Sequence, residues 1–208
     1  MTSSFPFWNS RHQLVLASKS ASRRALLEAA GIPFSVDTPE VDERAIEEGL
    51  TSEGRSGEDL SLILARAKAV DVSQRRPGAL CLGADQVLTL EGAVFHKPRT
   101  LDEAETHIER LSGKTHVLSS AFAIARDGRV IGEGQDAASL TMRALDRARI
   151  SLYARVAGPA ILSSVGAYQL EALGVHLFER IEGDHTTILG LPMLKLLAWL
   201  RQEGALSL

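Results

Sequence analysis

One carboxylate of the chain lies in a segment whose neighbours predict burial. Asp85 belongs to a short polar segment between two apolar strand halves, residues 79–82 and 87–90. A carboxylate inside a strand is buried only where it is paired, bound to a metal or used in catalysis. Lys97 follows beside a rigid proline, where it offers a point charge of the kind that binds phosphate. These residue types favour phosphate chemistry around Asp85.

A second polar cluster, residues 18–24, joins an apolar strand at residues 13–17 to a helix at residues 25–30. The start of a helix exposes free N–H groups and the positive end of the helix dipole, which together attract anions. Hydroxyls and two arginines add donors, so the cluster can cradle phosphate, although it lacks the glycine-rich run of a Walker A loop. Taken alone, the cluster fits an ordinary helix cap with solvated arginines better.

Acidic residues form a third cluster between Glu40 and Glu43. Closely spaced carboxylates hold hard divalent cations through their oxygen atoms. An acidic loop is more often simply solvated, and the cluster alone favours that alternative.

Several familiar catalytic sites are excluded. The Gly-Lys-Thr sequence at residues 113–115 leads from a helix into a strand, whereas a P-loop leads from a strand into a helix. The six histidines show no metal-ligand spacing, and a Gly-x-Ser-x-Gly elbow is missing. Cys81, the single cysteine, lies in an apolar run and is expected in the core.

Composition limits the function further. The chain has 208 residues, of which 23 are basic and 26 acidic, for a net charge of −3. The chain therefore carries no strong basic field, which argues against binding to nucleic acid or to a membrane. A single cysteine suits a reducing cytoplasm, where we expect the protein. We expect residues 1–12 to be a flexible leader, in which Phe5, Phe7 and Trp8 either dock or stay loose, and residues 13–208 to be one domain.

The order of elements predicts an α/β fold with a mixed twisted sheet and flanking helices. Residues 115–143 contain two alternating runs split by Asp127 and Gly128, which is a strong hairpin signal. Residues 38–58 are acidic and are expected to be irregular. Further helices are expected at residues 59–73, 101–111, 145–156 and 192–201, and further strands at residues 34–36 and 175–181.

Taken in order, these clusters resemble the Maf family of nucleoside triphosphate pyrophosphatases, from about Leu14 to Gly204. Each matching segment is weak alone, but their order and spacing are specific. The segments are residues 16–24, 40–43, 67–69, 83–87, 97–98, 111–116, 166–168 and 183–192. The resemblance implies a mixed α/β fold with two lobes around a central cleft, related to the inosine-triphosphate pyrophosphatases.

The resemblance also implies a reaction: hydrolysis of a nucleotide between its α and β phosphates, which yields a nucleoside monophosphate and pyrophosphate. It implies a divalent metal, Mg²⁺ or Mn²⁺, held by Glu43 and Asp85, with Asp85 as the general base. Members of the family are cytoplasmic and often dimeric, so a homodimer is one expected state. The implied phosphate-binding residues are Ser18, Arg24, Lys68 and Lys97, with Arg23 as the alternative to Arg24.

Two further positions bear on the choice of substrate. Gln86 and Glu171 resemble the residues of the subgroup that acts on 7-methyl-GTP. A carboxylate at Glu171 suits that substrate, because it can accept from guanine N1–H and the exocyclic amine and it favours the positive charge of the methylated base. Ser22 stands where that subgroup often has an aromatic residue, and Ala21 replaces the usual proline, so a broader triphosphate specificity stays open. The alternative function is a non-catalytic nucleotide-binding regulator, for example of cell division. A generic phosphatase, which would release orthophosphate, is a third.

Overall fold

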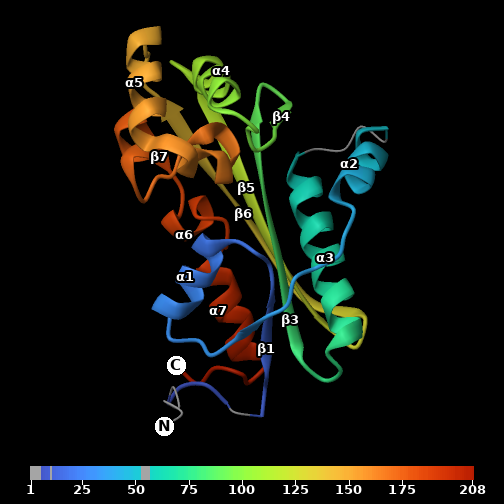
Figure 1. Cartoon of the computed structure of the whole chain (residues 1–208). Helices are drawn as coiled ribbons and strands as arrows, with labels where there is room; N and C mark the ends of the chain where they lie inside the picture. Colours follow the sequence, from blue (N-terminus) through green and yellow to red (C-terminus); the bar gives the residue numbers. More distant parts are fainter. Residues whose placement is uncertain (1–5, 10, 53–56) are drawn as a thin grey trace. The chain divides into compact units, whose positions relative to one another are not determined.

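A computed structural model describes residues 6–9, 11–52 and 57–208 of the chain. Within them the strands form one sheet in the order β2-β1-β3-β5-β6-β7, with β4 paired to β3 (Figure 1). The strands are β1 (Leu14–Ala17), β2 (Ser35–Val36), β3 (Leu80–Leu90), β4 (Ala93–Phe95), β5 (Thr115–Arg126), β6 (Arg129–Met142) and β7 (Phe178–Glu182). β1 pairs in parallel with β2 and β3, whereas β4 and β7 pair antiparallel with β3 and β6. The predicted mixed α/β sheet is therefore confirmed.

Helices lie before, between and after these strands. They are α1 (Ala21–Ala29), α2 (Glu43–Ser52), α3 (Gly57–Arg75), α4 (Leu101–Leu111), α5 (Arg147–Ala157), α6 (His185–Ile188) and α7 (Met193–Gln202). Short 3₁₀ segments occupy much of residues 158–177. None of the helices in the described part of the chain is both long and apolar enough to cross a membrane.

The chain divides into two compact units. The first comprises the chain up to Gln86, Ser120–Asp136 and Gly190–Leu208, and the second comprises Val87–Ser119 and Ala137–Leu189. The division falls inside β3, β5 and β6, so each of these strands contributes residues to both units. The two predicted lobes correspond to these units, and the cleft implied by the resemblance stays a prediction.

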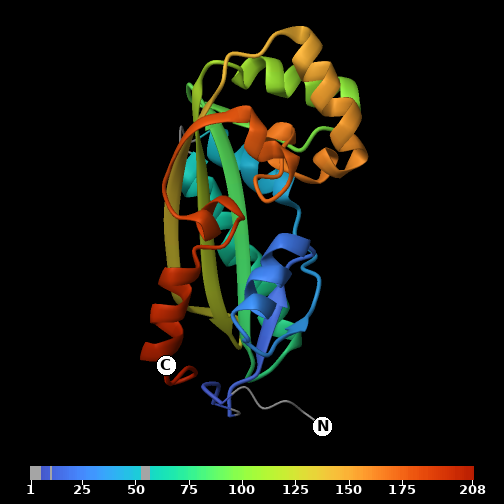
Figure 2. The ribbon, with the colours of Figure 1, turned by 90° about the vertical axis from the view of Figure 1, so that its left-hand side faces the viewer.

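In the first unit, helices cover both faces of the sheet (Figures 1 and 2). Successive side chains of a strand point to opposite faces. Leu16, Leu82 and Phe122 face α1 and α7, where they form one core with Leu27 and Leu196. The alternation predicts that the residues between them face α3.

The face toward α3 carries small residues, which lets the helix approach closely. Alanines of β5 pack there against alanines of α3. A Cβ added to Gly83 would lie 2.5 Å from the Ala69 backbone nitrogen, so a side chain at Gly83 has no room. Asp85 follows two residues later and points to the same face, whereas Gln86 points to the face of α1.

The second unit has its own core around α4 and α5. Ile108 of α4, Ile150 of α5 and Leu140 of β6 are buried together. Both helices begin at side-chain caps: Thr100 accepts from the backbone N–H of Glu103, and the carboxylate that precedes α5 accepts in the same way. These caps explain why both helices begin within two residues of their predicted starts.

Some predicted bounds are wrong: α1 begins at Ala21 rather than at residue 25, and the strand expected at residues 175–181 begins at Phe178, after a 3₁₀ segment. One prediction of the kind of structure is also wrong. Residues 43–52, expected within an irregular stretch, form α2. Asp42 explains the difference, because its Oδ1 accepts from the backbone N–H of Ala45 at 3.1 Å. Such a cap satisfies a free donor at the start of a helix, and the acidic first residue Glu43 is favoured by the helix dipole.

The N-terminal residues that the structure describes contact the C-terminal segment. Trp8 forms an isolated β-bridge with Leu206. Phe7 and Trp8 also pack against the core that contains α7. The docked alternative therefore applies to these two side chains, while Phe5 lies outside the described residues.

Candidate functional site

Lys68 is a buried lysine of the first unit that pairs with two carboxylates. It lies on the face of α3 that is buried against the sheet, and it is 6% exposed. Its Nζ lies 2.5 Å from Asp85 Oδ1 and 2.9 Å from Glu43 Oε1. A buried ammonium group requires charged partners. The structure thus brings together three of the predicted site residues, with Lys68 between two negatively charged carboxylates.

Asp85 reaches Lys68 from β3, and Glu43 reaches it from the start of α2. The Asp85 side chain is buried, as the sequence predicted, whereas the Glu43 side chain is 55% exposed. The sequence allowed pairing, metal binding or catalysis as reasons for burial of Asp85. Its ion pair with Lys68 is one such reason, and it places a lysine beside both carboxylates.

Arg23 and Ser18 form a second group of contacts at the start of α1. Arg23 Nε donates to the Gly190 carbonyl oxygen at 2.8 Å, and Nη1 donates to Ser18 Oγ at 3.2 Å. Burial lowers the pKa of Arg23, while the nearby carboxylates of Asp85 and Glu43 raise it. The guanidinium group is therefore within electrostatic reach of both carboxylates around Lys68.

Arg24 and Ser22 take other positions on the same helix. A helix turns by about 100° per residue, so neighbours of Arg23 point in different directions. The Arg24 side chain is exposed and Ser22 is half-buried. The geometry thus favours Arg23, which the sequence gives as the alternative to Arg24, because Arg23 is buried and donates to Ser18 and Gly190 whereas Arg24 is exposed.

Gln86 lies on the opposite face of β3 from Asp85. Its Nε2 donates to Ser120 Oγ of β5 at 3.0 Å. A Cβ added to Gly190 would lie 3.5 Å from Arg23 Nε and 3.8 Å from the Gln86 amide carbon. Arg23 and Gln86 therefore both lie beside Gly190, whose positive φ of 96° favours glycine.

Lys97 and Glu171 belong to the second unit. Lys97 follows β4, whose last residue Phe95 is buried beneath the Arg110 guanidinium at 4.2 Å. Glu171 lies in an irregular stretch before the 3₁₀ segment Leu173–Leu177. Both side chains are exposed. Their predicted roles in binding phosphate and base stay predictions.

The second unit also contains a buried polar pair that the sequence did not reveal. His116 Nε2 and Tyr168 Oη lie 2.7 Å apart, and Phe178 packs on both rings. Burial lowers the pKa of His116 to about 4 and raises the pKa of Tyr168. The contact with His116 holds Tyr168, which directly follows Gly166 and Ala167, two residues with positive φ.

The carboxylates around Lys68 can take part in metal binding. Mg²⁺ is commonly held by one or two carboxylates together with substrate phosphates and water. Glu43 and Asp85 supply two such carboxylates, and the described residues contain no group of three histidine, cysteine or acidic side chains placed to hold a metal. The donor set therefore fits a cation that is shared with a phosphorylated substrate better than a cation that is bound by protein alone.

Two contributors to this arrangement were not predicted as site residues. Ser120 holds Gln86, and Gly190 accepts from Arg23. The adjacent hydroxyls at 119 and 120, inside the otherwise apolar stretch of residues 117–125, are a signal for the first. Gly190 was part of a matching segment, but its role depends on a contact between residues 167 positions apart.

Comparison with known proteins adds independent findings. The family model described as Maf-like protein matches residues 13–203. A protein of Brucella abortus named 7-methyl-GTP pyrophosphatase is 50% identical over 94% of this chain and 98% of its own length. One of Bradyrhizobium diazoefficiens named nucleoside triphosphate pyrophosphatase is 47% identical over 96% of this chain and 98% of its own length. A solved HAM1 protein of Coxiella burnetii aligns with a TM-score of 0.45 and 18% identity over 63% of this chain and 73% of that one.

Proposed function

Because this chain belongs to the Maf-like protein family, we propose that it is a nucleoside triphosphate pyrophosphatase that acts on 7-methyl-GTP. The observation that carries the proposal is the buried Lys68 between the carboxylates of Asp85 and Glu43. Two full-length relatives named as pyrophosphatases support the reaction, and one of those names supports the substrate.

Positive charge is the first requirement of the reaction. Phosphoryl transfer needs mainly positioning and neutralisation of the phosphate oxygens. Arg23 and Lys68 supply two buried cations in the first unit. Ser18 holds one of them and can donate its own hydroxyl hydrogen to a phosphate. Lys97 is proposed as a further phosphate ligand, and Arg24 as a more exposed one.

Activation of water is the second requirement. Asp85 is proposed as the general base that accepts a proton from the attacking water. Before substrate binds, one of its oxygens is engaged by Lys68. Negatively charged phosphates compete for the same ammonium group, so substrate binding releases Asp85 to accept the proton. The attacking oxygen bonds to phosphorus, and pyrophosphate leaves as the α-β bond breaks.

A divalent cation, Mg²⁺ or Mn²⁺, is proposed as the cofactor. Glu43 and Asp85 would hold it, and when bound it would neutralise charge on the triphosphate. Glu43 remains half-exposed, so it can exchange its contact with Lys68 for other partners.

Recognition of 7-methyl-GTP is proposed to involve Glu171 and Gln86. A carboxylate at Glu171 accepts from guanine N1–H and the exocyclic amine, and it attracts the positive charge of the methylated ring. Gln86 is oriented by Ser120. Ser22 stands where the 7-methyl-GTP subgroup often has an aromatic residue that could stack on the base, so we expect discrimination between bases to rest on hydrogen bonds rather than on stacking.

The test is release of pyrophosphate from a nucleotide panel with Mg²⁺ or Mn²⁺. The panel contains 7-methyl-GTP, GTP, UTP, dTTP, CTP and 5-methyl-UTP, and the Asp85→Asn variant is the control. We expect Asp85-dependent release, fastest from 7-methyl-GTP. Release of orthophosphate alone would indicate a phosphatase. A folded protein that binds nucleotide without hydrolysing any of the panel would indicate a regulator.

A further inference from the structure

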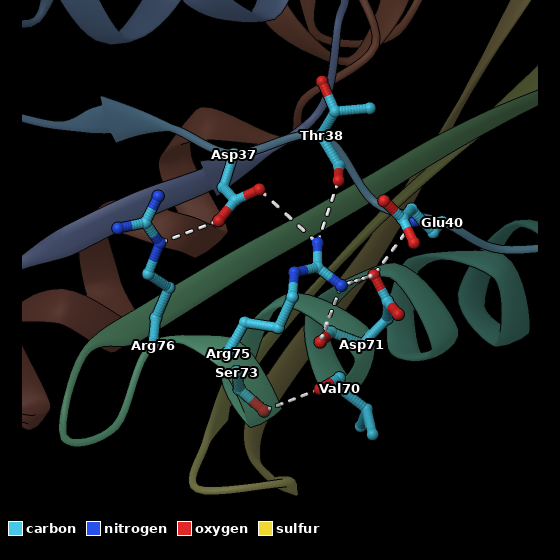
Figure 3. Close-up of polar contacts among 8 residues, drawn as sticks. All are labelled: Asp37, Thr38, Glu40, Val70, Asp71, Ser73, Arg75 and Arg76. Carbon is cyan, nitrogen blue, oxygen red and sulfur yellow. Dashed lines mark hydrogen bonds and ion pairs between the residues drawn. The ribbon is translucent and has the colours of Figure 1, made fainter.

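The segment between β2 and α2 carries Glu43 toward Lys68 but contains no regular structure of its own. Two of its backbone groups are held by side chains of α3 (Figure 3). The Glu40 N–H donates to Asp71 Oδ2 at 2.9 Å, and the Thr38 carbonyl oxygen accepts from Arg75 Nη2 at 2.9 Å. The path of the segment is therefore fixed by contacts with a helix that follows it in sequence.

Arg75 is the hub of these contacts. Its Nη1 donates to Asp71 Oδ2 at 2.8 Å, and Nη2 also lies 3.4 Å from Asp37 Oδ1. Arg76 Nε donates to the other oxygen of Asp37 at 2.7 Å. The hydrogen bond from Arg76 is the main cause that lowers the pKa of Asp37, so this carboxylate stays ionised. Arg75 thus contacts both the start of the segment, at Asp37, and Asp71, which accepts from the Glu40 N–H.

The same face of α3 serves both ends of the segment. Lys68, Asp71 and Arg75 are three and four residues apart, a spacing that aligns side chains along one side of a helix. Lys68 contacts Glu43 at the end of the segment. The other two hold its beginning and middle. Movement of the segment away from α3 would therefore draw Glu43 away from Lys68.

We propose that Arg75 is a positioning residue, which fixes the segment from Asp37 to Asp42 on α3 and thereby sets how tightly Glu43 contributes to binding of the divalent cation and triphosphate. This inference rests on the proposed function. The hydrogen-bond partners of Arg75 are Asp37, Thr38 and Asp71. Arg75 therefore acts through the segment and is not a catalytic residue.

The size of the effect follows from the kind of contact. Ion pairs this exposed contribute little to the free energy of unfolding, because solvent screens them. The Arg75 side chain is 38% exposed. Residues that orient a metal ligand typically change metal affinity or activity by about 10- to 100-fold when they are replaced. We therefore expect a change in metal use without loss of the fold.

Arg75→Ala is the test variant and Arg126→Ala its matched control. Arg126 pairs with Glu203 at 2.8 Å and is 33% exposed, so its loss removes a similar ion pair that has no contact with the segment. Amide hydrogen exchange is the first measurement, and it needs no turnover. We expect the Glu40 amide to exchange faster in Arg75→Ala than in wild type and to be unchanged in Arg126→Ala.

The Mg²⁺ dependence of pyrophosphate release is the second measurement. We expect the half-activating Mg²⁺ concentration to rise about 10-fold in Arg75→Ala, with kcat at saturating Mg²⁺ close to wild type. The half-activating Mg²⁺ concentration of Arg75→Lys should lie between those of wild type and Arg75→Ala, because a single ammonium group replaces the planar guanidinium group. In a Glu43→Gln background, Arg75→Ala should add no further change, because both act on the same contribution.

The outcomes separate this inference from the proposed function. Wild type without any pyrophosphate release would overturn the proposed function and, with it, the role of Arg75 in metal use. Active wild type with an Arg75→Ala variant that matches Arg126→Ala in exchange and in Mg²⁺ dependence would overturn the inference alone. Additive effects of Arg75→Ala and Glu43→Gln would also overturn it.

Discussion

We expect replacement of Asp85 by asparagine to abolish the proposed catalysis while leaving the fold intact. The change keeps the size and one oxygen acceptor of the side chain, and it removes the negative charge and the ability to take a proton at neutral pH. Removal of a general base slows a reaction by about 10²- to 10⁴-fold. At 1.36 kcal/mol for each factor of ten, the barrier rises by about 3–5 kcal/mol.

The structure limits the accompanying loss of stability. An orphaned buried charge costs about 3–5 kcal/mol of folding free energy. Lys68 is not orphaned by the change, since Glu43 Oε1 remains 2.9 Å from its Nζ. We therefore expect the free energy of unfolding to fall by less than about 3 kcal/mol, so Asp85→Asn should stay folded at room temperature.

Two assays on the same preparation test this reasoning. Pyrophosphate release from 7-methyl-GTP should fall by at least about 100-fold. Calorimetric titration without a divalent cation should show nucleotide affinity close to that of wild type, because Arg23 and Lys68 remain. Glu133→Gln is the control, since Glu133 pairs with Arg66 through two short hydrogen bonds on the surface of the same unit. Near-normal turnover of Asp85→Asn would refute the role of Asp85 as the base.

Three further predictions concern the base, the buried histidine and the packing of α3. Glu171→Gln should shift the ratio of turnover on 7-methyl-GTP and GTP by about 10-fold toward GTP, the worth of one charged hydrogen bond, and an unchanged ratio would exclude Glu171 from base recognition. His116 has a pKa of about 4 in the folded protein, below the value of about 6.5 in an unfolded chain, so its contribution to stability is present above pH 6.5 and falls as the pH drops toward 4. Denaturant unfolding should therefore lose about 1 kcal/mol between pH 7.5 and 5.5 through this residue, and a His116→Gln variant with the same pH slope as wild type would contradict the assignment. Gly83→Ala should lower the free energy of unfolding by about 1–3 kcal/mol, because the added methyl group meets the backbone of α3, and unchanged thermal unfolding would disprove the close approach.

Much of the fold could be predicted because local signals agreed with the final structure. The hairpin at Asp127 and Gly128 has both residues at positive φ, as an Asp-Gly turn requires. The helix at residues 101–111 was predicted to the residue. The helix α2 was missed because the density of acidic residues concealed a cap at Asp42, which depends on one side-chain hydrogen bond.

The site could be predicted only in part, for a physical reason. Residue types and strand alternation pointed to a buried Asp85, but its partner lies on a helix that precedes it by 17 residues. The contact between Arg23 and the Gly190 carbonyl oxygen joins opposite ends of the chain. Such pairings arise from the packing of elements rather than from local sequence, so the sequence indicated the residues without their contacts.

The position of Lys68 between two carboxylates explains how the proposed triphosphate site can remain stable before substrate binds. A buried cation without a counter-charge would cost several kcal/mol, on the order of an unpaired buried ion. Lys68 avoids that cost because Asp85 and Glu43 neutralise it. A triphosphate brings negative charge of its own, so it can replace these carboxylates at the ammonium group and release them for other partners. Under the proposed function, the contacts that neutralise Lys68 in the free protein are the contacts that substrate would exchange, and this would link the packing of α3 to the proposed reaction.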